Sequence, residues 1–154
     1  MDVSTAAGKP ALAESRALRG TLLGLLIALV VQAVLGAAVN LYVTTPQSAR
    51  GAGILAASGK AISDGGPALA LHAILGALVT LGSIAAVIRA VRARRRPTIL
   101  ACTAGLACLL GAFAAGAAFV SDTTSGSSMA MAVLTGAAMI AYLLAYSSVA
   151  AARD

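Results

Sequence analysis

The chain has 154 residues, of which 60% are hydrophobic and 10% are charged, and its formal net charge at pH 7 is +6. Soluble domains carry about a quarter charged residues, so this composition excludes an ordinary soluble domain and indicates one integral membrane domain. The positive charges flank apolar segments, which argues against nucleic-acid binding and favours contact with membrane lipids through their anionic head groups.

The first 19 residues are small and polar, and they include Lys9, Arg16 and Arg19. We expect residues 1–19 to form a flexible tail on the cytoplasmic side. The apolar stretch that follows, residues 20–43, is too long for the apolar core of a secretory signal, which spans about 7–15 residues. It is therefore predicted to be a retained membrane-spanning helix.

Within this first span, small or polar residues recur at every fourth position. Such a ridge drifts only slowly around a helix, and small residues let a second helix approach closely. The ridge predicts close packing, either within the chain or against a second copy or a membrane-protein partner. Its members are Gly20, Gly24, Ala28, Gln32, Gly36 and Asn40, and the first two form a GxxxG motif.

Three further apolar segments follow, at about residues 67–90, 97–120 and 128–151. Each is close to the ~20 residues that a helix needs to cross ~30 Å of hydrocarbon. Pro67 and Pro97 suit the first turn of a helix, where the missing N–H is harmless. The sequence therefore predicts an all-α protein with four transmembrane helices and residues 20–151 as its membrane domain.

The first two spans are joined by a long connection, residues 44–66, whereas residues 121–127 form a tight turn between the last two. The long connection contains a short amphipathic piece, which is predicted to lie on the membrane surface or over the mouth of the bundle. The apolar residues of this piece are Ile54, Leu55, Ala56 and Ile62.

The basic residues set the predicted orientation. Arg50 and Lys60 fall on one side of the spans, and all the others fall on the opposite side. The positive-inside rule places that opposite side in the cytoplasm, so we expect an up-down bundle in the cell membrane with both termini, including residues 152–154, cytoplasmic. The cytoplasmic basic residues are Lys9, Arg16, Arg19, Arg89, Arg92, Arg94, Arg95, Arg96 and Arg153.

His72 is the one side chain within the spans that can change charge near neutral pH. An ionisable group in hydrocarbon is a functional-site hypothesis by default. In the predicted topology it lies ~7–8 Å below the outer end of the second span. The candidate neighbours in the same layer are Asn40, Ser128, Met129 and Met131.

Three interpretations of His72 remain open. It could bind haem or copper together with a thioether sulfur, which gives His72, Met131, Met129 and Asn40 as candidate cofactor-binding residues. It could contact a quinone or relay a proton. It could also be a neutral, structural histidine that is hydrogen-bonded to Asn40, Ser128 or a backbone carbonyl.

No motif of nucleophilic, phosphate-binding or zinc-dependent catalysis occurs in the sequence, and the spans contain no Asp or Glu. We therefore expect no catalytic machinery and no metal site. The predicted function is that of a small multi-pass membrane protein that works through helix contacts with itself or with a partner. The alternative is a haem- or redox-linked membrane protein with His72 as the ligand.

Three sequence stretches carry a resemblance to known families: Val31-Gln32-Ala33 through Val43, Leu71–Gly76 and Ser127–Ala132. Together they resemble a family of small uncharacterised bacterial membrane proteins over all four spans. More distantly, the first two stretches are similar to a four-helix half of haem A synthase and to cytochrome b561-type bundles. That similarity implies a haem in the bundle, although the second ligand histidine of those families is missing here.

Overall fold

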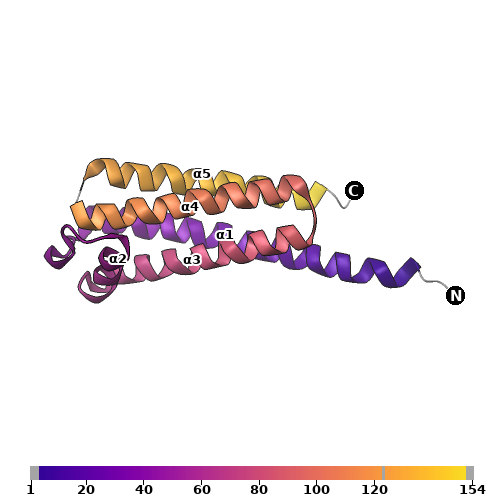
Figure 1. Ribbon diagram of the computed structural model, residues 1–154, viewed down its shortest axis with the longest axis horizontal. Coiled ribbons are helices and arrows are strands. Elements are labelled where there is room, and N and C mark those ends of the chain that lie inside the picture. Colours follow the sequence, from indigo (N-terminus) through magenta and orange to yellow (C-terminus); the bar gives the residue numbers. More distant parts are fainter. Residues whose placement is uncertain (1–3, 123, 152–154) are drawn as a thin grey trace.

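The computed structural model describes residues 4–122 and 124–151 and is built from helices (Figure 1). In this part of the chain four helices are long and apolar enough to cross a membrane, which confirms the predicted all-α class with four apolar helices. They are α1 (Ser4–Tyr42), α3 (Gly66–Arg92), α4 (Arg96–Asp122) and α5 (Ser125–Ala150).

The helix boundaries follow local sequence signals except at the start of α1. Pro67 occupies the first turn of α3, and Arg94 has a positive φ of 54° in the short connection that turns the chain from α3 into α4. α1 already begins at Ser4, so most of the stretch expected to be a flexible tail is helical. Alanine, leucine, arginine and glutamate dominate residues 11–19, and these residues favour a helix even without a membrane.

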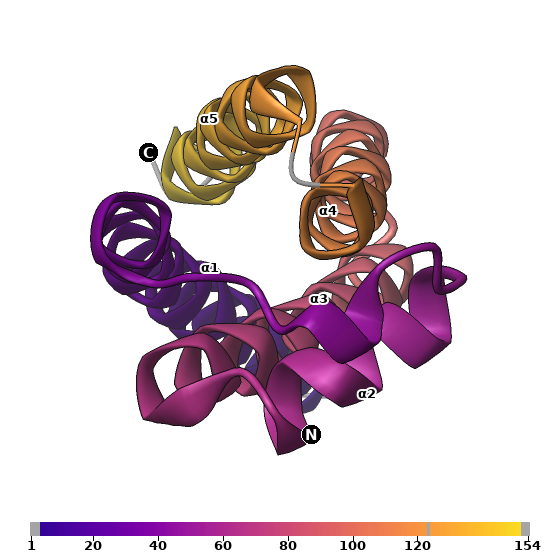
Figure 2. The same cartoon turned by 90° about the vertical axis from the view of Figure 1, so that its left-hand side faces the viewer.

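The four long helices form a ring in the order α1, α3, α4, α5, and each packs against its two neighbours (Figure 2). The last turn of α5 and the arginine-rich connection between α3 and α4 lie at one end of the bundle, and the N-terminal part of α1 projects beyond this end (Figure 1). We call this the arginine end. The opposite end carries a short helix, α2 (Ile54–Ser63), and is called the α2 end.

The two halves of the bundle have separate cores. The core nearer the arginine end contains large side chains, among them Leu18, Leu22, Leu29 and the fully buried Tyr142. The core at the α2 end is built mainly from smaller residues. Its buried members are Val39, Ala49, Ala57, Ala61, Leu69, Ala117 and Val120.

Glycines allow the close approach of neighbouring helices. A methyl group at Gly105 of α4 would lie 2.6 Å from Cζ of Tyr142, and one at Gly82 of α3 would lie 3.1 Å from Cδ2 of Leu25. The GxxxG motif behaves differently, because a methyl group at Gly20 or Gly24 would have no neighbouring atom within 4 Å. These two glycines therefore take no part in packing within the described chain.

The amphipathic piece predicted in the long connection is α2, and it packs across α3 and α4 (Figure 2). Its buried face consists of Ala57 and Ala61, whereas Leu55 is 84% exposed and Ile62 is 43% exposed. Alanines form the contact because they let α2 lie close against the long helices. The larger apolar residues of α2 point away from the bundle.

Candidate binding cavity

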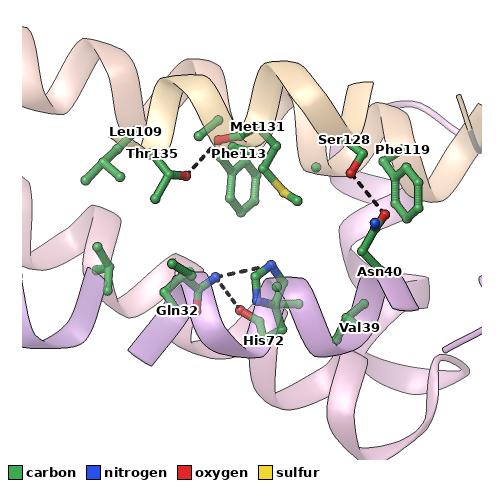
Figure 3. Close-up of a pocket in the computed structure, with 18 of the residues that line it drawn as sticks. Gln32, Val39, Asn40, His72, Leu109, Phe113, Phe119, Ser128, Met131 and Thr135 are labelled. Atoms are coloured by element: carbon green, nitrogen blue, oxygen red, sulfur yellow. Dashed lines mark hydrogen bonds between the residues drawn. The ribbon is translucent and has the colours of Figure 1, made fainter. Parts of the chain in front are cut away.

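A cavity of about 440 Å³ lies inside the α2 half of the bundle (Figure 3). All four long helices and α2 contribute to its wall, and no residue that lines it is an Asp, Glu, Lys or Arg. The cavity exists because the α2 half is built mainly from alanine, glycine and valine, which are too small to fill the space between four helices. Its chemistry is therefore set by apolar side chains and a few neutral polar groups.

His72 and Gln32 form one polar wall of this cavity (Figure 3). The Nε2 atom of Gln32 donates a hydrogen bond of 2.9 Å to the backbone carbonyl of His72. The same Nε2 atom lies 3.4 Å from Nε2 of the His72 ring. α1 and α3 are thus joined by a polar contact between a side chain of one and the backbone of the other.

Two glycines make room for this pair. A methyl group at Gly36 of α1 would lie 2.9 Å from Cε1 of His72, and one at Gly76 of α3 would lie 3.0 Å from Nε2 of Gln32. The polar side chain of each helix therefore packs against a glycine of the other helix. This reciprocal arrangement fixes where the imidazole and the carboxamide sit.

Two buried polar atoms in this wall have no partner within the described residues: Oε1 of Gln32 and Nδ1 of His72. A buried polar group without a partner costs about 1–3 kcal/mol, so such atoms call for an explanation. A neutral imidazole has one donor and one acceptor, and because Nε2 of His72 accepts from the Gln32 carboxamide, Nδ1 is the donor that is left for a ligand. Together with the Gln32 carbonyl oxygen, the wall can therefore both donate hydrogen bonds to a ligand and accept them from it.

The facing wall is formed by α4 and α5, from which Phe113, Met131 and Thr135 point into the cavity (Figure 3). A methyl group at Gly116 would lie 3.2 Å from Sδ of Met131, so this glycine makes room for the thioether. The Thr135 hydroxyl donates to the backbone carbonyl of Met131 at 2.8 Å. Its oxygen lone pairs remain available as acceptors.

The four residues predicted as candidate ligands are not all brought together. His72, Met131 and Asn40 line the cavity, but Met129 is 67% exposed and does not line it. Asn40 does not bond to His72; its Oδ1 accepts a hydrogen bond of 3.0 Å from the Ser128 hydroxyl, which joins α1 to α5. The partner of His72 is Gln32, which belongs to the predicted ridge, although its spacing alone did not indicate the contact.

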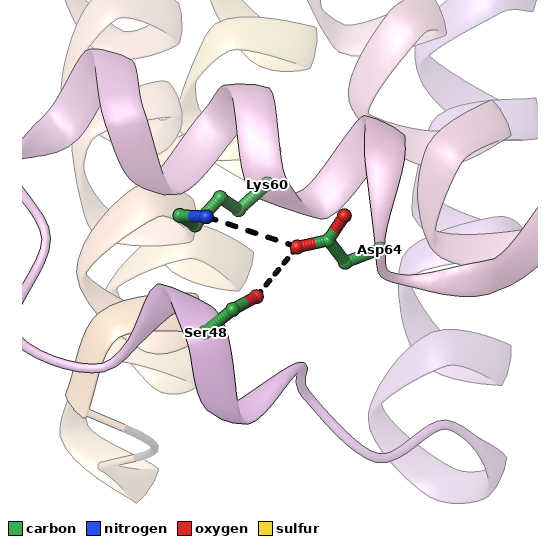
Figure 4. Close-up of polar contacts among 3 residues, drawn as sticks. All are labelled: Ser48, Lys60 and Asp64. Carbon is green, nitrogen blue, oxygen red and sulfur yellow. Dashed lines mark hydrogen bonds and ion pairs between the residues drawn. The ribbon is translucent and has the colours of Figure 1, made fainter.

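Next to the cavity, α2 is held by a polar cluster with the 3₁₀ turn η1 (Gln47–Ala49) (Figure 4). The Ser48 hydroxyl donates a hydrogen bond of 2.6 Å to Oδ2 of Asp64, and Nζ of Lys60 lies 3.8 Å from the same oxygen. The Ser48 hydrogen bond is the main cause that lowers the pKa of Asp64 below its ordinary value of 3.8, with smaller contributions from Ser63 and Lys60. The carboxylate is consequently charged at neutral pH.

Comparisons with protein-family models, with curated proteins and with solved structures found no match for this chain. What the cavity can bind is therefore inferred from the residues that line it.

The packing of His72 against Gly36 predicts a coupled effect of two substitutions. We expect Gly36→Ala to lower the free energy of unfolding by about 1–3 kcal/mol, because the new methyl group must displace the imidazole. In a His72→Ala background the same substitution should have little effect, since the ring is gone. Thermal unfolding in detergent micelles would measure both steps of this double-mutant cycle. Gly24→Ala, at a position free of contacts, is the control, and an equal loss in both backgrounds would contradict the contact.

The Ser48–Asp64 hydrogen bond predicts a pH dependence. A carboxyl group whose pKa is lowered in the folded state contributes stability above its unfolded pKa, and this is lost as the pH falls through the folded pKa. The anchoring of α2 should thus be complete above pH 3.8 and weaken below it. Ser48→Ala should raise the Asp64 pKa in an NMR titration of its carboxyl carbon. Ser58→Ala should not, because Ser58 bonds to Ile54 within α2; a rise in both variants would refute the assignment.

Proposed function

We propose that this integral membrane protein binds a neutral, mostly apolar molecule in the cavity of its α2 half. The observation that carries the proposal is an uncharged cavity of about 440 Å³ in which Gln32 Oε1 and His72 Nδ1 are buried without a hydrogen-bond partner among the described residues. Ligand sites in proteins occupy about 300–1,000 Å³ and combine apolar walls with a few well-placed polar groups. The cavity has both properties.

The proposed orientation places the arginine end in the cytoplasm and the α2 end outside, with the helices crossing the cell membrane in alternate directions. Charge supports this, because Arg89, Arg92 and residues 94–96 gather where α3 and α4 meet, whereas Lys60 at the other end is paired with Asp64. Arg19 also fits, since its guanidinium donates a hydrogen bond of 2.9 Å to the Tyr146 hydroxyl. Arginines near the ends of spans reach for polar surroundings in this way.

The proposed role is binding and not catalysis. His72 is the only titratable side chain that lines the cavity, and no carboxylate, cysteine or second histidine of the described residues lines it with His72. Contact with a second copy or a membrane-protein partner remains part of the proposal. Gly20 and Gly24 support it, because both are exposed and a methyl group at either would have no neighbour within 4 Å among the described residues. Small residues of this spacing favour close helix crossings.

Haem binding is a second candidate, favoured by one observation. His72 and Met131 lie on opposite walls of the same cavity (Figure 3), as the axial ligands of a haem would. Haem also carries two propionates, and none of the lining residues is an arginine or lysine that would pair with them. A neutral ligand therefore suits the wall better than haem does.

Filling the cavity should abolish binding of a neutral apolar probe. Ala112 lines the cavity and is only 7% exposed, so Ala112→Leu places three additional carbon atoms inside it. We expect fluorescence titration with 1-aminoanthracene to show at least a tenfold weaker affinity, a loss of about 1.4 kcal/mol. Ala104→Leu, on the exposed side of α4, is the matched control. Equal affinity in the two variants would refute the cavity as the binding site.

The haem candidate has a spectroscopic test. If haem occupies the cavity, the purified protein reconstituted with haemin shows a Soret band that is lost in His72→Ala and shifted in Met131→Leu. Met129→Leu should leave the spectrum unchanged, because Met129 lies outside the cavity. A spectrum that His72→Ala does not alter would eliminate haem ligation by this residue.

A further inference from the structure

The cavity reaches the surface of the bundle between α1 and α5. Only four of its lining residues are exposed, and all four lie on these two helices. Three of them are alanines, whose short side chains leave the space between the helices open. The four residues are Ala33, Ala37 and Asn40 of α1 and Ala132 of α5.

The gap follows from the way in which the α2 half is packed. Its core draws buried residues from α1, η1, α2, α3 and α4, and no described residue of α5 belongs to it. α2 covers the side of α3 and α4 and leaves the side of α1 and α5 uncovered (Figure 2). Near the α2 end, the Asn40–Ser128 hydrogen bond of 3.0 Å connects α5 to α1. Among the described residues, one side-chain hydrogen bond and a row of alanines therefore border the gap on this side.

The gap faces the lipid side of the bundle. Val34 and Val133 follow lining residues on α1 and α5, and they are 66% and 61% exposed. Large apolar side chains with this exposure suit hydrocarbon in a chain that spans the membrane. A molecule that passes between α1 and α5 therefore comes from the bilayer and not from water.

The polar groups inside select the head group of such a molecule. Thr80 and Thr135 both donate to backbone carbonyls of their own helices, at 2.9 and 2.8 Å, and so face the cavity as acceptors. Gln32 Oε1 adds a third acceptor, whereas the imidazole of His72 offers a donor, Nδ1–H, because its Nε2 already accepts from the Gln32 carboxamide. Among these four residues acceptors outnumber the one donor, so the head group that matches them is neutral and donates through hydroxyl groups. The Phe113 ring adds a flat apolar surface beside it (Figure 3).

We propose that the cavity takes a neutral membrane lipid of the quinol class directly from the bilayer through the gap between α1 and α5. The hydroxyl-bearing ring lies against Gln32, His72 and Thr135, and the apolar tail leaves between Ala37 and Ala132. Because the tail lies outside, the cavity of about 440 Å³ needs to accommodate only the ring. This inference rests on the proposed binding function and adds the ligand class and its route.

The head-group part is tested with the full-length protein in nanodiscs and two probes that differ only in their hydroxyl groups. Decylhydroquinone should bind at least tenfold tighter than its bis-methyl ether, because only the free quinol can donate to the acceptors. Thr135→Val should reduce this preference, whereas Thr21→Val, whose hydroxyl bonds to Ala17 within α1, should leave it unchanged. Equal binding of quinol and ether to the unaltered protein would overturn the proposed class.

The route is tested by narrowing the gap. Ala132→Phe places an aromatic ring in it, and Val133→Phe places the same ring one residue away on exposed α5 surface. In stopped-flow measurements, decylhydroquinone should enter at least tenfold more slowly in Ala132→Phe and at the original rate in Val133→Phe. Circular dichroism would check that both variants are folded. Ala37→Leu provides a second, milder obstruction on α1.

The outcomes separate the route from the binding function. Unchanged quinol kinetics in folded Ala132→Phe and Ala37→Leu, with 1-aminoanthracene still bound and still blocked by Ala112→Leu, would overturn the route and leave the cavity as a binding site. If neither 1-aminoanthracene nor decylhydroquinone binds the unaltered protein, the binding function and the route are both overturned. Slower quinol exchange in both gap variants, with the control unchanged, would support the whole proposal.

Discussion

The reciprocal packing of two polar side chains against two glycines is the contact on which the candidate site depends. His72 of α3 lies against Gly36 of α1, and Gln32 of α1 lies against Gly76 of α3. This geometry brings the two helices close enough for Gln32 to reach the His72 backbone carbonyl. The same geometry leaves Oε1 of Gln32 and Nδ1 of His72 without a hydrogen-bond partner in the described part of the chain. A side chain larger than glycine at either position would change both the helix spacing and the polar wall.

The two halves of the bundle differ in packing: the half at the arginine end has a filled core, and the half at the α2 end contains the cavity. Near the arginine end, Tyr142 and several leucines fill a closely packed core. At the α2 end the core residues are mainly alanines and valines, and α5 contributes none of them among the described residues. The weaker packing there leaves a cavity and an uncovered side. A firmly packed half can tolerate such a gap in the other half, because local stability varies across a structure.

The sequence predicted the centre of the site but only part of its surroundings. His72 stands out from composition alone, and its predicted depth rests on the rise per residue of a helix. Met129 and Met131 could not be separated in this way, because they share a depth and differ by ~200° around the helix; the structure places only Met131 in the cavity. Gln32 was visible as a ridge residue, but its contact with His72 depends on how α1 and α3 are rotated relative to each other.

The sequence by itself determined the four apolar helices and the level of each residue along them, because hydropathy and helical rise are properties of a single segment. It also determined where glycines permit close packing. The tertiary structure decided which glycines are used: polar side chains pack against Gly36 and Gly76, whereas no described side chain packs against Gly20 or Gly24. It also decided that no described residue of α5 belongs to the core at the α2 end, which leaves the gap beside Ala132. Rotation and neighbour choice arise from contacts between helices, and a pattern within one helix cannot fix them.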